Sequence, residues 1–138
     1  MKFKLLIAMI GFITVLAAAQ TAPSMLGTWK IDSASSTVLG KGAHHPAHDK
    51  KETDIRFTKP MLTLVIDRQE GTNFAGTLSS GSHKEIILGA IAPDLQGGVM
   101  VDEDGTHTFK IVNANTIQNC YVQMAKPKLA ACWTGKRQ

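Results

Sequence analysis

Three histidines and one aspartate lie within a short stretch in the first half of the chain. His44, His45, His48 and Asp49 fall within six consecutive positions of the segment KGAHHPAHDK. Imidazole nitrogens and carboxylate oxygens bind zinc or copper, and zinc takes three or four such ligands in a tetrahedral array. An extended backbone directs His44 and His45 to opposite sides, whereas a turn at Pro46 would bring His45 and His48 together. The segment therefore predicts two or three ligands of a zinc or copper site.

This histidine segment is short of ligands by itself, and two other interpretations stay open. A complete zinc site would need a further ligand from elsewhere in the chain, such as His83 or His107. The segment is also compatible with a polar, solvated connection between two strands. A third interpretation is electrostatic, because protonation of its histidines near pH ~6 would add to the charges of Lys41, Lys50 and Lys51.

The sequence contains no pattern typical of a catalytic centre. A Gly-x-Ser-x-Gly elbow and a glycine-rich phosphate loop are both missing. Ser82 precedes His83, but neighbours in sequence do not make a nucleophile and its base. The acidic segment 102–105 resembles part of a calcium loop, but an EF-hand would require acidic residues in place of Met100 and Ile111. We therefore expect a protein that is not an enzyme, with a hairpin turn at 102–105.

The start of the chain has the layout of a secretory signal peptide. Lys2 and Lys4 give it positive charge, residues 5–16 are uncharged and almost wholly apolar, and three alanines follow at 17–19. This layout predicts a signal peptide at residues 1–19. The alternative, a membrane anchor, would need ~20 apolar residues. We therefore expect residues 20–138 to form one exported domain, periplasmic or extracellular, with no membrane span after cleavage.

Charge and cysteine content restrict the partners and the covalent structure. Removal of the signal peptide lowers the formal charge from +4 to +2, and no run of lysine and arginine exceeds two residues. We therefore expect no nucleic-acid partner. Cys120 and Cys132 are the only cysteines, and an even number in an exported chain predicts a disulfide. The alternative is a pair of free, buried thiols.

Most of the remaining chain has the alternation of half-buried β-strands. The segments 62–67, 74–79 and 108–111 alternate with a period of two. The segment 85–92, EIILGAIA, is apolar on both faces, as in a strand that is covered on both sides or meets a partner subunit. The Asp-Gly pair at 104–105 predicts a type I′ hairpin turn. About eight or nine short strands predict an all-β, up-and-down antiparallel barrel, in which closure removes the sheet edges.

The two cysteines predict the register of the last hairpin. If Cys120 faces Cys132 across an antiparallel pair, Asn119 faces Trp133, and Tyr121 lies on the same side of the sheet as both. Aromatic side chains with one or two polar groups are typical of a small-ligand pocket. Asn119, Tyr121 and Trp133 are therefore the candidate ligand-binding residues. The alternative is that these side chains fill the core of a narrow barrel.

The stretch SMLGTWKID, residues 24–32, resembles the first strand of the calycin superfamily, which includes lipocalins and avidins. In those barrels a Gly-x-Trp motif opens the first strand, and its tryptophan packs under the barrel floor, often against a basic side chain from the last strand. The resemblance implies that Gly27 and Trp29 play these structural parts, and that the basic pair Lys136-Arg137 supplies the partner, with Arg137 as our candidate.

The chain is also similar to an uncharacterised group of small exported proteins. They share a GTW start, a histidine-containing loop, a TLxIDxQxGxxFxGT-like hairpin, a DxDG turn and a C-terminal cysteine pair. Residues 63–77 and 102–105 carry two of these motifs. The resemblance spans most of the chain after the signal peptide, and it implies a calycin-type barrel without implying an activity.

These observations favour an exported, non-catalytic β-barrel protein that binds a small molecule in the barrel. Two other functions stay open. An inhibitor-type barrel would bind a secreted hydrolase as its protein partner, through residues 20–25 or through the histidine segment. A periplasmic metal-binding protein would hold zinc or copper with the side chains of the histidine segment.

Overall fold

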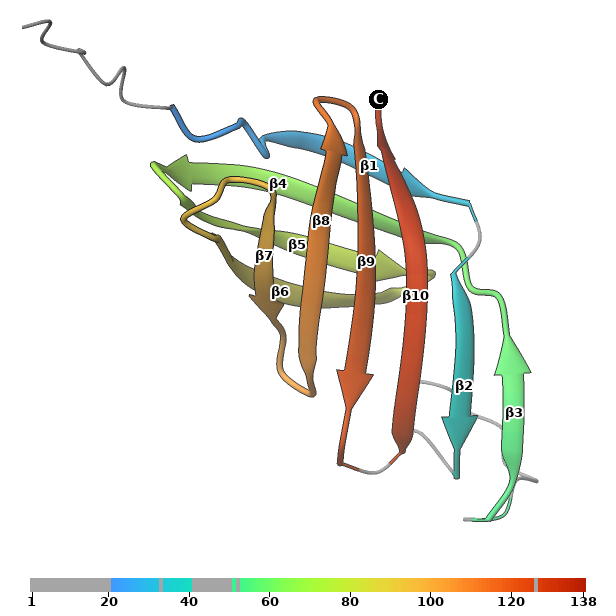
Figure 1. The fold of residues 1–138 in the computed structure, drawn as a ribbon. Helices are drawn as coiled ribbons and strands as arrows, with labels where there is room; N and C mark the ends of the chain where they lie inside the picture. Colours follow the sequence, from blue (N-terminus) through green and yellow to red (C-terminus); the bar gives the residue numbers. More distant parts are fainter. Residues whose placement is uncertain (1–20, 33, 41–50, 52, 126) are drawn as a thin grey trace, which may run out of the picture.

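A computed structural model of the chain describes residues 21–32, 34–40, 51, 53–125 and 127–138 (Figure 1). The regular secondary structure of this part is made of β-strands. Within it, no helix is long and apolar enough to cross a membrane. The strands are β1 (Gly27–Ile31), β2 (Ser35–Leu39), β3 (Ile55–Thr58), β4 (Leu62–Glu70), β5 (Asn73–Ser80), β6 (His83–Ile91), β7 (Gly97–Val101), β8 (Thr106–Asn113), β9 (Thr116–Gln123) and β10 (Lys128–Arg137).

Eight of these strands form a closed antiparallel barrel. Their order around the barrel is β1-β4-β5-β6-β7-β8-β9-β10. Closure comes from β10, which pairs with β1 through Trp29 opposite Arg137 and Lys30 opposite Lys136. From β4 to β10, strands that follow each other in sequence are neighbours in the barrel. The predicted all-β, up-and-down antiparallel barrel is therefore confirmed.

β2 and β3 extend one side of the barrel beyond the closed ring (Figure 1). β10 is ten residues long and pairs with β1 near its end and with β2 near its start. Among the described strands β3 pairs only with β2, so it forms a free edge of the sheet. The backbone N–H of Ala34 donates to the carbonyl oxygen of Pro60 at 3.0 Å. This bond joins the two chain segments where both pass from the barrel into the extension.

The register of the last hairpin agrees with the prediction made from the cysteines. Cys120 lies opposite Cys132 and Asn119 lies opposite Trp133. The two cysteines form the predicted disulfide, and both lie on the exposed outer face of the sheet. Asn119 and Trp133 are buried on the inner face, and Tyr121 is half-buried there. The alternation of a β-strand explains this separation of the covalent link from the barrel interior.

Two hairpins turn on glycines in the left-handed region. Gly71 between β4 and β5 has a φ of 56°, and Gly81 between β5 and β6 has a φ of 59°. Each is the first residue of a two-residue loop, because Glu70 pairs with Asn73 in one hairpin and Ser80 pairs with His83 in the next. A positive φ at this position is the requirement of a type II′ turn, which only glycine meets without strain.

The turn between β7 and β8 lies where it was predicted, but its predicted type is wrong. Four residues separate Val101 from its partner Thr106, and neither Asp104 nor Gly105 has a positive φ. The Asp102 carboxylate closes the turn instead, because its Oδ1 accepts from the backbone N–H groups of Asp104 at 3.0 Å and Gly105 at 2.7 Å. A side chain thus replaces the type I′ backbone conformation as the source of the bend.

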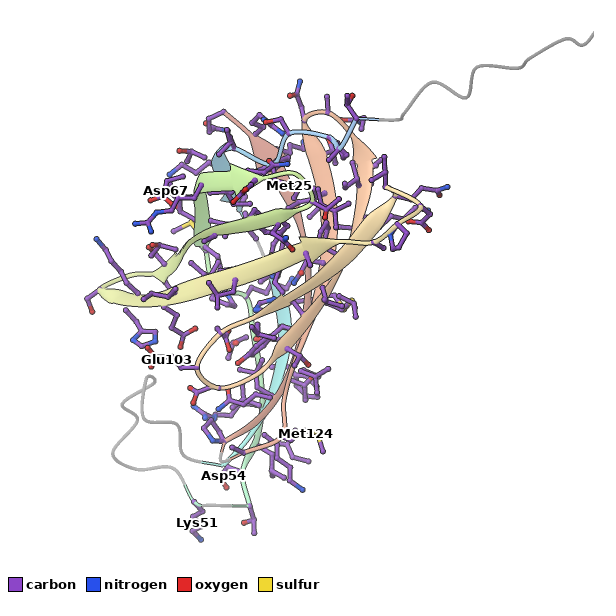
Figure 2. The ribbon with its side chains drawn as sticks, turned by 90° about the vertical axis from the view of Figure 1, so that its left-hand side faces the viewer. Met25, Lys51, Asp54, Asp67, Glu103 and Met124 are labelled. Atoms are coloured by element: carbon purple, nitrogen blue, oxygen red, sulfur yellow. A yellow bond between two sulfur atoms is a disulfide. The ribbon has the colours of Figure 1, made fainter. Side chains whose placement is uncertain are left out.

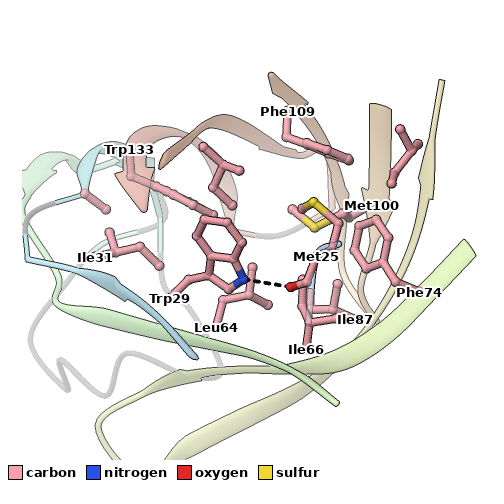
Figure 3. Close-up of a cluster of buried hydrophobic side chains, with 13 residues drawn as sticks. Met25, Trp29, Ile31, Leu64, Ile66, Phe74, Ile87, Met100, Phe109 and Trp133 are labelled. Atoms are coloured by element: carbon pink, nitrogen blue, oxygen red, sulfur yellow. Dashed lines mark hydrogen bonds between the residues drawn. The ribbon is translucent and has the colours of Figure 1, made fainter. Parts of the chain in front are cut away.

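An apolar core fills one end of the barrel, which we call the closed end. Trp29 is 1% exposed there, and its Nε1 donates to the carbonyl oxygen of Met25 at 3.0 Å (Figure 3). The Phe74 ring covers Gly89 on the paired strand, where a Cβ would lie 2.1 Å from the ring. The buried apolar residues are Met25, Trp29, Ile31, Ala34, Leu64, Ile66, Phe74, Ile87, Ile91, Met100, Phe109, Ile117 and Trp133.

The opposite end, which we call the mouth, carries the β7–β8 and β9–β10 turns. Figure 2 shows Met25 near one end of the barrel, with Glu103 and Met124 toward the other. Apolar side chains fill the closed end, so a ligand would find room toward the mouth.

Candidate functional site

The side chains that face the barrel interior change from apolar at the closed end to polar at the mouth. Along β9 the inward residues run from Ile117 through Asn119 and Tyr121 to Gln123. The neighbouring strand β8 places His107 directly beside Tyr121. The antiparallel register thereby gathers polar groups of different strands at one level of the barrel.

A cavity of about 170 Å³ lies on this polar side of the core. Leu62, Leu78 and Trp133 belong to its apolar wall, and Glu85 and Gln123 belong to its polar wall. An engineered cavity of ~150 Å³ in another protein holds benzene, whereas drug-sized ligands occupy pockets of ~300–1,000 Å³. The cavity therefore has room for a molecule about the size of a six-membered ring.

His107 is one of the deeply buried polar groups of the mouth. It is 2% exposed, and its Nε2 lies 3.2 Å from Oδ2 of Asp102. Its Nδ1 lies 3.0 Å from the side-chain amide of Asn119. In the amide orientation that satisfies every neighbour, the Asn119 oxygen accepts from His107 Nδ1, from Trp133 Nε1 at 3.2 Å and from the Cys120 backbone N–H at 3.2 Å. Both imidazole nitrogens are therefore engaged inside the protein.

Asp102 connects the β7–β8 turn to this network. Its side chain is 1% exposed, and it accepts from His107 in addition to the two backbone N–H groups of its own turn. Burial by itself would raise the pKa of Asp102. The hydrogen bonds from His107, Gly105 and Asp104 outweigh that effect, and the pKa of Asp102 lies below its usual value of 3.8. Asp102 is therefore an ionised carboxylate whose acceptors are used within the barrel.

Tyr121 stands between this network and the cavity. Its ring centroid lies 4.5 Å from that of His107, and its hydroxyl lies 3.4 Å from both Asp102 Oδ1 and Gln123 Oε1. Burial, followed by the negative charges of Asp102 and Glu85, raises the pKa of Tyr121 well above its usual 10.0. The phenol is therefore neutral at physiological pH, and its oxygen keeps acceptor capacity toward the cavity.

β6 supplies a second imidazole and carboxylate pair at the mouth. His83 Nε2 lies 2.7 Å from Oε1 of Glu85, and both residues line the cavity. The Glu85 side chain is 14% exposed. The two pairs, His83 with Glu85 and His107 with Asp102, reach the same cavity from different strands.

The structure places all three predicted ligand-binding residues on the inner surface of the last hairpin. Tyr121 and Trp133 line the cavity. Asn119 lies behind them, and its hydrogen bonds are made with other protein groups. Sequence reasoning missed Glu85 and Gln123 as cavity groups. Alternation along β9 is a signal that would have found Gln123, because it lies on the same face as Asn119 and Tyr121.

The candidate metal ligands His44, His45, His48 and Asp49 lie outside the described residues. Within the described part of the chain, no group of three or more His, Cys, Asp or Glu side chains is arranged to hold a metal ion. The two histidines considered as further ligands are those of the mouth, each paired with a carboxylate. The metal site remains a prediction.

The closed end has the contact that the calycin resemblance implies. The Arg137 guanidinium lies 4.4 Å from the centroid of the Trp29 ring. It also donates to the carbonyl oxygens of Leu26 at 2.6 Å and Ser24 at 2.5 Å. Gly27 has a φ of 129°, which favours glycine at the start of β1. The basic partner of the tryptophan is thus Arg137, the candidate chosen from the sequence.

The segment before β1 is held against the barrel. Gln69 donates from Nε2 to the carbonyl oxygen of Pro23 at 2.9 Å and accepts from the backbone N–H of Met25 at 2.6 Å. Met25 is 1% exposed. Residues 20–25 were considered as a contact with a secreted hydrolase. Of the described residues 21–25, Pro23 and Met25 bind the barrel and help to cover its closed end.

Comparison with known proteins returns no matching family model, no matching curated protein and no matching solved structure.

Proposed function

We propose that this protein is an exported, non-catalytic barrel of the calycin type that binds a small molecule in the cavity at its mouth. The observation that carries the proposal is the cavity of about 170 Å³, which adjoins the buried apolar core and combines an apolar wall with convergent polar groups. The calycin assignment draws support from the up-and-down barrel and from Arg137 over Trp29.

Export draws support from the disulfide and from the first residues. Cys120 and Cys132 are bonded on the exposed face of the sheet, and such bonds persist mainly in oxidising compartments. Residues 1–19 have the composition of a signal peptide.

A non-catalytic role draws support from the way the buried titratable groups are used. Both nitrogens of His107 have protein partners, and the Asp102 carboxylate faces donors from Asp104, Gly105, His107 and Tyr121. A general base needs a lone pair within reach of its substrate. These groups instead fix the position of Tyr121 at the cavity.

Binding in the cavity is tested by filling it. Ala131 lines the cavity from β10, whereas its neighbour Ala130 is exposed on the outer face of the same strand. We expect ligand-detected NMR with a set of fragments of up to ten non-hydrogen atoms to show binding to the wild type and to Ala130→Leu. Ala131→Leu should lose it. Equal binding by both variants, or none by the wild type, would contradict the proposal.

A second candidate function, binding of a protein partner, is favoured by one feature of the outer surface. Ile86 and Leu88 of β6 are 64% and 56% exposed, and Leu88 pairs with Val101, which is 42% exposed. Ile86 and Leu88 belong to the segment 85–92, which was predicted to be covered on both sides or to meet a partner. No other described part of the chain covers its outer face. An exposed apolar strip of this kind is typical of a contact surface. Leu88→Asp should abolish any association seen by analytical ultracentrifugation, and a monomer at all concentrations without a captured partner would count against this function.

A further inference from the structure

The cavity at the mouth is lined by more negative than positive side chains. Glu85, Asp102 and Asp104 belong to its lining, together with the imidazoles of His83 and His107. The described lining residues include no lysine or arginine. Even with both imidazoles protonated, the described side chains of the lining carry a net negative charge. A low-dielectric cavity with one sign of charge favours ligands of the opposite sign.

Glu85 brings to the cavity a carboxylate oxygen that no other described residue uses. Its Oε1 faces His83 Nε2 at 2.7 Å, and no hydrogen bond joins Oε2 to another described residue. The side chain is 14% exposed and lines the cavity. A carboxylate oxygen in such a place is an acceptor for a charged donor.

Gln123 adds an amide group to the lining of the same cavity. It is 7% exposed, lines the same cavity, and its Oε1 is engaged by the Tyr121 hydroxyl at 3.4 Å. No hydrogen bond joins its Nε2 to another described residue, and this nitrogen is not one of the fully enclosed atoms that lack a partner. The nitrogen therefore offers a donor to an oxygen atom or an aromatic face of a bound molecule.

The rest of the cavity fits an apolar or aromatic body. Leu62, Leu78 and Leu129 line one part of it, and the Trp133 ring separates it from the core. The faces of Trp133 and Tyr121 also attract cations, because aromatic rings carry negative charge on their faces. The volume of about 170 Å³ limits the body to roughly one ring.

We propose that the cavity selects a small organic cation, a protonated amine on a compact apolar or aromatic body, with the ammonium group at Glu85 and an acceptor or ring face at Gln123. The inference rests on the proposed function, and it adds the chemical class of the ligand. The ammonium group replaces solvent at Oε2 of Glu85, and the body occupies the space between Leu62, Leu78 and Trp133.

The test compares three probes of similar size and different charge. Benzylamine, benzyl alcohol and benzoate are titrated by calorimetry into the wild-type protein at pH 7. We expect benzylamine to bind about tenfold more tightly than benzyl alcohol, since one charge-assisted hydrogen bond is worth roughly that factor. Benzoate should bind most weakly, and the preference for the amine should fall as salt is added.

Two variants locate the preference. Glu85→Gln should weaken benzylamine about tenfold and leave benzyl alcohol unchanged. Glu103→Gln, which removes an exposed carboxylate of the β7–β8 turn that does not line the cavity, should change neither affinity. If Glu85→Gln does not fold, the ratio of the wild-type affinities and its dependence on salt decide the question alone.

The outcomes separate this inference from the proposed function. Equal binding of benzylamine and benzyl alcohol, or tighter binding of benzoate, overturns cation selection and leaves a small-molecule site in place. Failure of all three probes to bind overturns the inference, while the fragment test on Ala131→Leu and Ala130→Leu still decides the function.

Discussion

Replacement of Asp102 by alanine should be among the most destabilising single changes in this barrel. The carboxylate is 1% exposed and holds its own turn through two backbone N–H groups while it pairs with His107. Removal of a buried carboxylate that is paired and hydrogen-bonded costs ~3–5 kcal/mol. The lost turn bonds, accepted at Oδ1, fall largely within that figure because Oδ1 belongs to the same carboxylate as Oδ2, which faces His107. We expect Asp102→Ala to lower the free energy of unfolding by about 4 kcal/mol.

Asp102→Asn should cost less, about 1–2 kcal/mol. An asparagine oxygen can still accept from the N–H groups of Asp104 and Gly105, and its amide nitrogen can donate to a neutral His107. Asp94 provides the control, because its carboxylate also accepts a backbone N–H, that of Gln96 at 3.0 Å, but on the exposed surface. Asp94→Ala should cost less than ~1 kcal/mol.

Urea unfolding followed by tryptophan fluorescence measures these differences. With a slope of ~1–3 kcal/mol per molar urea, a loss of ~4 kcal/mol moves the midpoint of Asp102→Ala down by more than ~1 M. The pKa of Asp102 is lower in the folded state than its usual 3.8. Its stabilising contribution is therefore complete above pH ~4 and is lost as the pH falls through the lowered pKa.

The difference in free energy of unfolding between the wild type and Asp102→Asn should accordingly disappear as the pH falls from 7 to 2. A gap that keeps its size at pH 2, or a loss below ~1 kcal/mol for Asp102→Ala at pH 7, would refute the assignment of Asp102 as the charged link between turn and barrel.

Three further changes probe the closed end, the disulfide and the cavity. Arg137→Ala removes the stack on the tryptophan ring and two hydrogen bonds, and should cost about 2–3 kcal/mol in urea unfolding. Lys136→Ala, an exposed neighbour, should cost less than ~0.5 kcal/mol, and equal losses would contradict the stack. Cys120 and Cys132 are 12 residues apart, and replacement of both by alanine should lower the free energy of unfolding by ~3 kcal/mol in the same assay. An unchanged free energy of unfolding would contradict a role of the disulfide in global stability. Tyr121 is the chain's single tyrosine, so phenolate absorbance reports on it alone and should appear only well above pH 10.0, together with unfolding. Its pKa is raised in the folded state, so the free energy of unfolding falls as the pH rises past the usual value of 10.0. Ionisation near pH 10 in the folded protein would contradict the burial of Tyr121 beside carboxylates.

The elements that sequence reasoning predicted correctly depend on short-range rules. Alternation with a period of two identifies the inner face of β4, β5 and β8, and turn residues at short intervals predict the up-and-down order. Cys120 and Cys132 predict the register of β9 and β10, because a covalent pair 12 residues apart leaves one antiparallel alignment. The turn at 102–105 shows the limit of these rules. Its position follows from Asp-Gly, but its conformation depends on where the Asp102 side chain points.

The site depends on contacts between residues far apart in the sequence. Glu85 belongs to β6, Asp102 to the β7–β8 turn and Gln123 to β9, and only the closed barrel brings them to one cavity. Periodicity shows which face a side chain occupies, but it does not show which residues of other strands lie at the same level. The choice between a filled barrel and a pocket is likewise a matter of three-dimensional packing, since the same inward face is filled at Ile117 and open at Tyr121. The sequence alone determined the all-β class, the up-and-down order from β4 to β10 and the disulfide, because each follows from local periodicity, turn spacing or one covalent pair. The pairing of β1 with β4 and the extension by β2 and β3 were decided by the tertiary structure. The cavity and its charge were decided by the tertiary structure, because strand register and side-chain volume act together only once the barrel closes.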